Sequence, residues 1–313
     1  MVGIASAPPG QVSAVLSKPA EQEPPKLRSL DECTVGRHGA KISSHEATGN
    51  TLPLVRMNPL AFIGRTVLDG ASHVGRLTFF IVEAIRGLGE VRIWWPRMMI
   101  EAWNIGAGSL FIVLLISAFA GAVTALQTGY QFTGAIPYYV VGTLVVSSII
   151  LELGPVLTAL ILAGRIGARY AAELGTMRVT EQIDALESLG RSPASHLVIP
   201  RVLAGLLMIP ALTILANLSG ILSGWISVKA VLPVTDADFI YGAQYYWRPW
   251  DAWYSVIKAF FFAGSITVIS CYMGFNTQQG AEGVGRSTTT AVVTSSVLIL
   301  VLDTVLTRIL LNQ

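Results

Sequence analysis

Residues 136–163 read IPYYVVGTLVVSSIILELGPVLTALILA and include one charged side chain, that of Glu152. Because an α-helix rises about 1.5 Å per residue, about 20 apolar residues cross the roughly 30 Å hydrocarbon core of a bilayer. The stretch therefore predicts a membrane-spanning helix. It is longer than a straight crossing requires and contains Gly154 and Pro155, so we expect the helix to be tilted, kinked or partly broken there.

Four more apolar stretches of similar length flank this one. They lie at roughly 105–126, 202–228, 252–274 and 288–311. The composition agrees with a membrane protein, because 52% of the residues are hydrophobic and 13% are charged, whereas a soluble domain has about 25% charged residues. The sequence predicts an all-α integral membrane protein with five transmembrane helices, and it argues against a soluble α/β enzyme.

Charge and cysteine content exclude several classes of function. The chain has 21 Lys and Arg against 19 Asp and Glu, a balance that does not suit a protein binding a polyanion along its surface. Cys33 and Cys271 are far apart and the histidines do not cluster, so no disulfide scaffold, zinc site or redox site is expected. The glycine-rich stretch 280–288 lacks the Gly-Lys-Ser/Thr triplet of a nucleotide-binding loop. We expect no cofactor, metal or catalytic residue in this chain.

The region before the first span divides into two parts. Residues 1–57 are rich in Ser, Pro, Gly and Ala and predict a disordered extension without the apolar run of a signal peptide. In residues 58–104, apolar and charged side chains recur on opposite faces at helical spacing, which predicts an interfacial amphipathic helix ending at the Trp94-Trp95-Pro96-Arg97 stretch. The alternative is a helix packed on a soluble domain.

Basic residues gather on one side of the predicted spans. Eleven precede residue 105, five lie between Arg165 and Arg201, and Arg286 lies between the last two spans. The positive-inside rule therefore predicts a cytoplasmic N-terminus, a cytoplasmic 164–200 loop and an outer C-terminus. The aromatic-rich segment 236–250 is expected to form a short helix or turn at the outer headgroup level.

The 164–200 loop contains a second amphipathic segment. Thr180 is predicted to cap its N-terminus and Gly190 to end it. Its acidic face consists of Glu181, Asp184 and Glu187, and its apolar face of Ile183, Leu186 and Leu189. Such a helix can dock by its apolar residues and select a basic groove on a soluble partner. The alternative, a solvated helix folded back on the bilayer, would be expected to carry basic residues instead.

Two acidic side chains are predicted inside the membrane. A buried carboxylate is costly unless it is paired, hydrated or protonated. Glu152 is either a polar wall of a lipid cavity or a structural acid bonded to a neighbouring helix. For Asp303 we predict an ion pair with Lys258, which lies at a similar depth.

The outer end of the first span and the start of the second offer a mixture of apolar and uncharged polar groups. These residues are Thr124, Leu126, Gln127, Gln131, Phe132 and Tyr138. They predict one wall of a lipid cavity, and an ordinary interfacial loop with aromatic anchors is an equally good interpretation.

Three segments, in this order, resemble the MlaE/YrbE family of ABC-transporter permeases over roughly residues 60–313. They are ELGPVLTALILAGRIGARYAAELGTMRVTEQIDALESLG, GAEGVGRSTTTAVV and LVLDTVLT. The resemblance implies a transmembrane permease domain over 105–313 that forms a homodimer in a bacterial inner membrane, or less favourably in a plastid inner envelope. It also implies a cytoplasmic ATPase that binds ATP-Mg, a hexamer of MCE-domain proteins, and movement of phospholipids or other hydrophobic molecules between membranes.

The resemblance also assigns roles to residues. It implies that the segment from Thr180 to Gly190 is the helix that couples to the ATPase, and that Glu173 and Arg178 brace it. The ATPase-coupling residues are then Glu173, Arg178, Thr180, Glu181, Gln182, Asp184, Ala185, Glu187, Leu189 and Gly190. Leu151 and Glu152 are placed near the lipid cavity, although relatives often have arginine at the position of Leu151.

The function expected is an ATPase-driven lipid permease subunit. Its rival is an ATP-independent secondary transporter in which Glu152 or Asp303 relays protons. An intramembrane enzyme would need a metal or nucleophile constellation, and the sequence shows neither.

Overall fold

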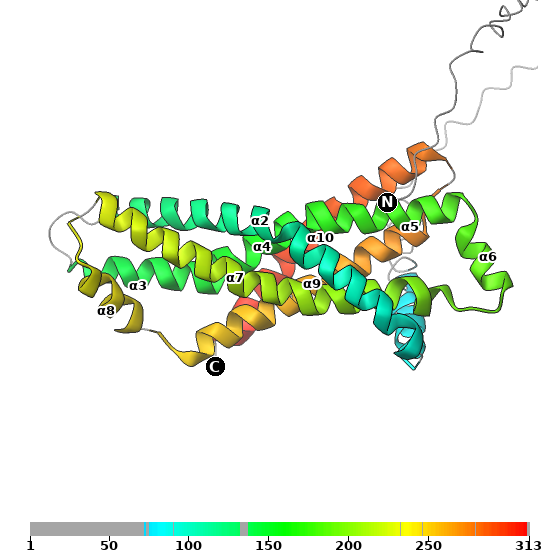
Figure 1. Ribbon diagram of the computed structural model, residues 1–313, viewed down its shortest axis with the longest axis horizontal. Coiled ribbons are helices and arrows are strands. Elements are labelled where there is room, and N and C mark those ends of the chain that lie inside the picture. The colour runs from blue at the N-terminus through cyan, green and yellow to red at the C-terminus, as the bar shows by residue number, and fades with distance from the viewer. Residues whose placement is uncertain are drawn as a thin grey trace, which may run out of the picture. The chain divides into compact units, whose positions relative to one another are not determined.

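The structure is a computed structural model that describes residues 72, 75–89, 91–131, 137–231, 233–245, 247–278 and 280–311 (Figure 1). All regular elements within these ranges are helical. Among the described residues, five helical segments are long and apolar enough to cross a membrane, namely Val91–Gln131, Tyr139–Val179, Ala194–Val231, Pro249–Phe275 and Ala281–Leu310. The predicted all-α, five-span fold is confirmed. The predicted extension 1–57 and Phe132 lie outside the described residues.

Four spans are built around one long α-helix each. These are α2 (Val91–Gln131), α7 (Ile199–Val231), α9 (Pro249–Phe275) and α10 (Ala281–Leu311). A short π-helix, η3 (Ala194–Val198), leads into α7. The helices extend well beyond the apolar stretches, since α2 begins at Val91 rather than near residue 105.

The second span is interrupted by two π-helical turns. It consists of α3 (Tyr139–Ser148), η1 (Ile149–Leu153), α4 (Gly154–Leu162), η2 (Ala163–Gly167) and α5 (Ala168–Val179). The π-helical turn η1 ends directly before Gly154 and Pro155, where the sequence predicts an irregularity, and π-turns of this kind are frequent at functional sites. A Cβ atom on Gly154 would lie 1.7 Å from Asn217 Oδ1 of α7, so glycine allows these two spans to approach.

Small residues bring α2 and α7 together along their length. A Cβ atom on Gly121 would lie 2.0 Å from the carbonyl oxygen of Gly220. Ser219 Oγ donates to the Leu114 carbonyl at 2.9 Å, and Ser117 Oγ donates to the Ala216 carbonyl at 2.5 Å. Close backbone approach with serine hydrogen bonds is a common way to pack helices in lipid.

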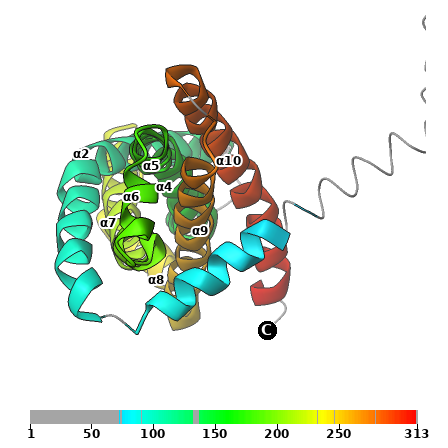
Figure 2. The same ribbon diagram turned by 90° about the vertical axis from the view of Figure 1, so that its right-hand side faces the viewer.

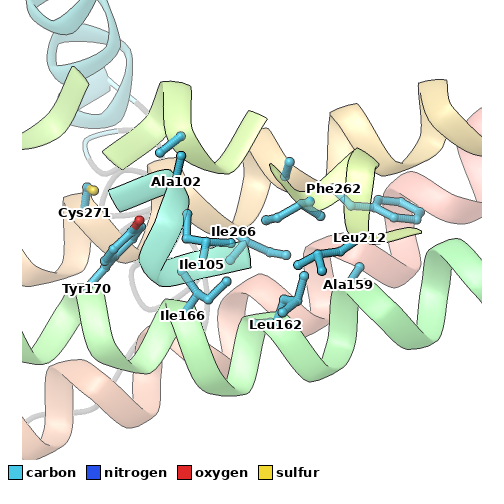
Figure 3. Close-up of a cluster of buried hydrophobic side chains, with 14 of the residues drawn as sticks. Ala102, Ile105, Ala159, Leu162, Ile166, Tyr170, Leu212, Phe262, Ile266 and Cys271 are labelled. Carbon is cyan, nitrogen blue, oxygen red and sulfur yellow. The ribbon is translucent and has the colours of Figure 1, made fainter. Parts of the chain in front are cut away.

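A buried apolar cluster joins all the spans (Figure 3). Among its fully buried members are Ile105 of α2, Leu162 of α4, Leu212 of α7 and Phe262 of α9. Ile299 of α10 belongs to the same cluster. The bundle is therefore one packed unit around this core.

At the end of the bundle opposite α6 (Gln182–Ser188), the helix α8 (Asp236–Tyr245) packs on α3. Thr143 Oγ1 donates to the Gly242 carbonyl at 2.6 Å, and the rings of Tyr139 and Tyr241 meet edge to face at 5.6 Å. This confirms the short helix predicted within 236–250.

A helix over residues 75–87 precedes α2 and crosses in front of α9 (cyan in Figure 2). Phe80 packs edge to face on Tyr272 and Phe275 at the end of α9, at 5.8 and 5.4 Å. The predicted end of this helix at the Trp-Trp-Pro stretch is wrong, because the chain turns at residues 88–89 and Pro96 lies inside α2. Gly87 and Gly89 favour the turn, and a proline near a helix start removes few backbone hydrogen bonds.

Candidate functional site

The segment predicted to couple to an ATPase forms α6, which projects at one end of the bundle (Figure 1). The prediction that Thr180 caps its N-terminus is wrong. α5 continues to Val179, so the Thr180 backbone N–H and hydroxyl both donate to the Thr176 carbonyl, at 3.0 and 2.8 Å. Thr180 therefore closes α5, and Glu181, with a left-handed φ of 57°, makes the turn into α6.

Gly190 ends α6 as predicted. Its φ is +72° and its N–H donates to the Glu187 carbonyl at 2.9 Å, while the Arg191 N–H donates to the Leu186 carbonyl at 3.1 Å. These two bonds form a Schellman motif, which satisfies the last carbonyls of a helix and requires a left-handed residue such as glycine.

The two faces of α6 are in different environments. Ile183 is 1% exposed and belongs to the core cluster, and Leu186 packs against that cluster. Leu189 differs from the predicted apolar face, since it is 75% exposed beyond the end of the helix. The side chains exposed on α6 and its N-terminal turn are Glu181, Gln182, Asp184, Ala185, Glu187 and Ser188. The helix thus presents acids outward and is anchored inward by Ile183.

The two residues implied as braces of this helix have different partners. Arg178 forms an ion pair with Asp184 and so ties the end of α5 to α6. Glu173 instead contacts Arg169 in α5, with the Nε and Oε1 atoms 2.6 Å apart, and Arg201 in α7, with the Nη2 and Oε2 atoms 3.2 Å apart. Glu173 therefore joins the spans on either side of α6 rather than α6 itself.

Arg201 is the centre of a charge cluster across three spans. Its side chain is 7% exposed, its guanidinium lies over the Tyr170 ring at 5.6 Å, and its Nε is 4.0 Å from Glu101 Oε1 of α2. Arg169 Nη2 lies 3.8 Å from the other oxygen of Glu101. Two arginines and two glutamates thus balance each other, and removing one member of a buried pair of this kind usually costs about 3–5 kcal/mol.

A second charge cluster lies midway through the bundle. Lys258 Nζ is 2.7 Å from Asp303 Oδ1, so the structure brings the predicted pair together. The same Nζ lies 2.9 Å from both carboxylate oxygens of Glu152. Lys258 is fully buried, whereas the side chain of Glu152 is 42% exposed and that of Asp303 is 20% exposed. One cation therefore serves two carboxylates from η1 and α10.

Hydroxyl groups complete the surroundings of Glu152. Thr307 Oγ1 donates to Glu152 Oε1 at 3.2 Å, and Tyr254 Oη lies 3.4 Å from the same oxygen and 3.1 Å from Thr307 Oγ1. The Leu151 carbonyl accepts from Lys258 Nζ at 3.3 Å. Glu152 is both bonded to neighbouring helices and partly exposed, so both interpretations made from the sequence have a structural basis.

The predicted lipid-cavity residues of the first span lie at the end of α2. Leu126, Gln127 and Gln131 are exposed, and Thr124 is half-buried with its hydroxyl donating to the Ala120 carbonyl at 2.7 Å. The structure also shows a groove on another face, with a volume of about 540 Å³ between η1, α7 and α9. Its lining is apolar except for Asn217, and it includes Ile150, Leu218, Trp253 and Val256.

This groove was not predicted from the sequence, and neither was the ion pair of Lys258 with Glu152. The signal for the groove is Asn217, a polar residue in an apolar span, whose Nδ2 donates to Ser255 Oγ of α9 at 2.9 Å. Both features depend on which faces of separate helices meet, and the sequence of an apolar span gives little indication of which of its faces contacts a neighbouring helix.

The chain is similar to known permeases. The family described as Permease MlaE matches residues 98–309. A probable ABC transporter permease protein of Rickettsia prowazekii is 38% identical over 247 residues, which are 79% of this chain and 95% of that protein. The intermembrane phospholipid transport system permease protein MlaE of Haemophilus influenzae is 33% identical over 256 residues, 81% of this chain and 98% of that protein. The chloroplastic protein TRIGALACTOSYLDIACYLGLYCEROL 1 of Arabidopsis thaliana is 34% identical over 282 residues, 90% of this chain and 77% of that protein.

Proposed function

Because the chain belongs to the MlaE permease family, we propose that it is the membrane-spanning subunit of an ABC transporter. In this proposal it moves phospholipids or related hydrophobic molecules between membranes. A separate cytoplasmic ATPase binds ATP and Mg²⁺, and the permease itself catalyses no reaction. The multi-pass fold and the names of the relatives support the proposal.

The observation that carries the proposal is the placement of α6. It presents Glu181, Asp184 and Glu187 outward between the second and third spans, which suits a basic groove on a soluble partner. Ile183 inserts into the core cluster, and Arg178 ties α6 to α5. Because packed interiors transmit displacement rather than absorb it, a force applied to α6 reaches the spans.

The transported molecule would meet the bundle at two features. The apolar groove beside Ile150 suits an acyl chain, and the partly exposed Glu152 with its hydroxyl partners suits a polar headgroup. Large apolar side chains also remain exposed on other faces of α2, such as Phe119 at 64% and Val123 at 59%. These faces support a homodimer in which two copies enclose the path.

We place the complex in a bacterial inner membrane, with the N-terminus and α6 in the cytoplasm. The other proposed partner is a hexamer of MCE-domain proteins on the opposite side. The basic residues at the α6 end of the bundle, including Arg92 and Arg97, support this orientation.

Charge reversal on α6 tests the docking. A tagged chain carrying Glu181→Lys and Glu187→Lys is captured from membranes, and ATP hydrolysis is measured in the captured material. We expect the hydrolysis to fall to background, while a Glu282→Lys control, which reverses another exposed acid at the start of α10, retains it. Full hydrolysis with the α6 variant would show that the ATPase binds elsewhere.

One observation favours a second candidate, an ATP-independent secondary transporter. Glu152 and Asp303 share Lys258 within the membrane, and intramembrane carboxylates of this kind often relay protons. A pH gradient that drives lipid movement in liposomes containing only this chain would favour the secondary transporter.

A further inference from the structure

A small cavity lies between α2, η3 and the start of α7, at the end of the bundle that carries α6. Its volume is about 160 Å³. It is lined by Arg97, Ile100, Glu101, His196, Leu197, Pro200 and Arg201. The cavity is separate from the apolar groove and from the Glu152 cluster described above.

The cavity has unused donor capacity. Arg201 is 6% exposed, and its Nε has no hydrogen-bond acceptor among the described residues, since Glu101 Oε1 is 4.0 Å away. Arg97 Nη1 donates to the His196 carbonyl at 2.9 Å, which holds the Arg97 guanidinium at the cavity wall. Buried donors in native proteins nearly always have an acceptor, so Arg201 Nε can take a further acceptor, and Glu101 Oε2 in the same lining is also without a hydrogen-bond partner among the described residues.

The charge balance around the cavity is positive. Glu101 and Glu173 neutralise Arg169 and Arg201 within their cluster. Arg97 remains in excess at the cavity wall. Arg191 is exposed nearby, where its Nη1 lies 3.5 Å from His196 Nε2, and it adds to the excess. The cavity therefore favours an anion, although the carboxylate of Glu101 is part of its lining.

The position of the cavity suits the headgroup layer of a membrane. At about 1.5 Å per residue, Arg97 and Gln127 of α2 lie about 45 Å apart, which matches a bilayer of about 40–45 Å including its headgroups. From the cavity, an apolar stripe runs along the surface of α2 toward the bilayer centre. Ile100 is 62% exposed, Trp103 is 74% exposed and Phe111 is 76% exposed.

We propose that this cavity binds the phosphate of a phospholipid in the cytoplasmic leaflet, with an acyl chain lying along the α2 stripe. Arg97 and Arg201 Nε donate to the phosphate oxygens. A free phosphate would meet the same cations but would leave the exposed apolar side chains uncovered, and so the stripe favours the lipid. The site requires only that the chain spans a membrane, and it is independent of the ATPase.

Lipid binding to the purified full-length chain tests the site. Native mass spectrometry in detergent measures the apparent Kd of added phosphatidylglycerol for the unmodified chain and for Arg97→Gln. Losing a charge-assisted hydrogen bond is expected to weaken binding about tenfold or more. The control Arg92→Gln removes an exposed arginine of the same helix that does not line the cavity, and it should leave the Kd unchanged.

Three further measurements make the outcome decisive. Diacylglycerol, which lacks the phosphate, should bind equally to the unmodified chain and to Arg97→Gln. Arg97→Lys, which keeps the charge, should recover part of the affinity for phosphatidylglycerol. This recovery would show that the loss in Arg97→Gln comes from the missing charge and not from misfolding. Inorganic phosphate should compete only weakly with phosphatidylglycerol for the cavity. Equal losses in Arg92→Gln and Arg97→Gln would overturn the proposal, and so would inorganic phosphate that binds as tightly as the lipid.

Discussion

Replacing Lys258 with methionine should destabilise the protein more than neutralising either carboxylate beside it. Lys258 Nζ lies 2.9 Å from both oxygens of Glu152 and 2.7 Å from Asp303 Oδ1, and the lysine is fully buried. With all three groups ionised, the cluster carries one net negative charge. Lys258→Met leaves two carboxylates without a cation, whereas Glu152→Gln leaves a balanced lysine–aspartate pair.

The expected magnitudes follow from these charges. Removing one partner of a buried ion pair costs about 3–5 kcal/mol, and we expect Lys258→Met to reach the upper part of this range because two carboxylates lose their cation. Glu152→Gln should cost about 1.5–3 kcal/mol, the usual contribution of hydrogen bonds to a charged group. The side chain of Glu152 is 42% exposed, which keeps that cost lower.

The assay is unfolding in mixed detergent micelles with increasing SDS, followed by circular dichroism and tryptophan fluorescence. The free energy of unfolding should fall in the order unmodified, Glu152→Gln, Lys258→Met. Adding Glu152→Gln and Asp303→Asn to Lys258→Met should recover at least half of the loss, because no buried charge remains. A Lys258→Met protein as stable as Glu152→Gln would refute the assignment of Lys258 as the shared cation.

Two smaller predictions concern packing and pH. Gly121→Ala should lower the unfolding midpoint and reduce expression, because its Cβ would lie 2.0 Å from the Gly220 carbonyl oxygen. The control Gly164→Ala has open space around its Cβ position and should change neither property. Equal behaviour of the two variants would contradict the close contact between α2 and α7. The hydrogen bond from Lys229, 2.8 Å away, lowers the pKa of Asp236. Its contribution to stability is then present above the ordinary aspartate pKa and is lost as the pH falls through the lowered value, so Asp236→Asn should slightly lower the stability measured near neutral pH and should leave the stability below the lowered pKa unchanged.

The sequence predicts the spans well because apolar length is a direct consequence of bilayer thickness. It predicts helix ends less well, since hydropathy marks the hydrocarbon core and not the helix. Arg92, Arg97 and Glu101 interrupt the apolar pattern, yet all three belong to α2. The helix continues because backbone hydrogen bonding does not depend on the surrounding lipid.

The features of the candidate sites that depend on neighbouring residues in the chain could be predicted from the sequence. Gly190 ends α6 because a left-handed cap favours glycine, and this is visible in the sequence. Thr180 was misplaced because its role depends on whether the preceding helix has already ended. The third partner of the intramembrane cluster, Glu152, could not be paired with Lys258 from the sequence, since their contact depends on how η1 and α9 are rotated against each other.

Lipid movement in proteoliposomes tests the central claim most directly. The purified chain is reconstituted with a fluorescent phospholipid, with and without the ATPase subunit and Mg-ATP, and transfer of the lipid to an acceptor is measured. We predict transfer only when ATPase and Mg-ATP are both present, and its loss in the Glu181→Lys, Glu187→Lys variant. Equal transfer by the chain alone would contradict the account.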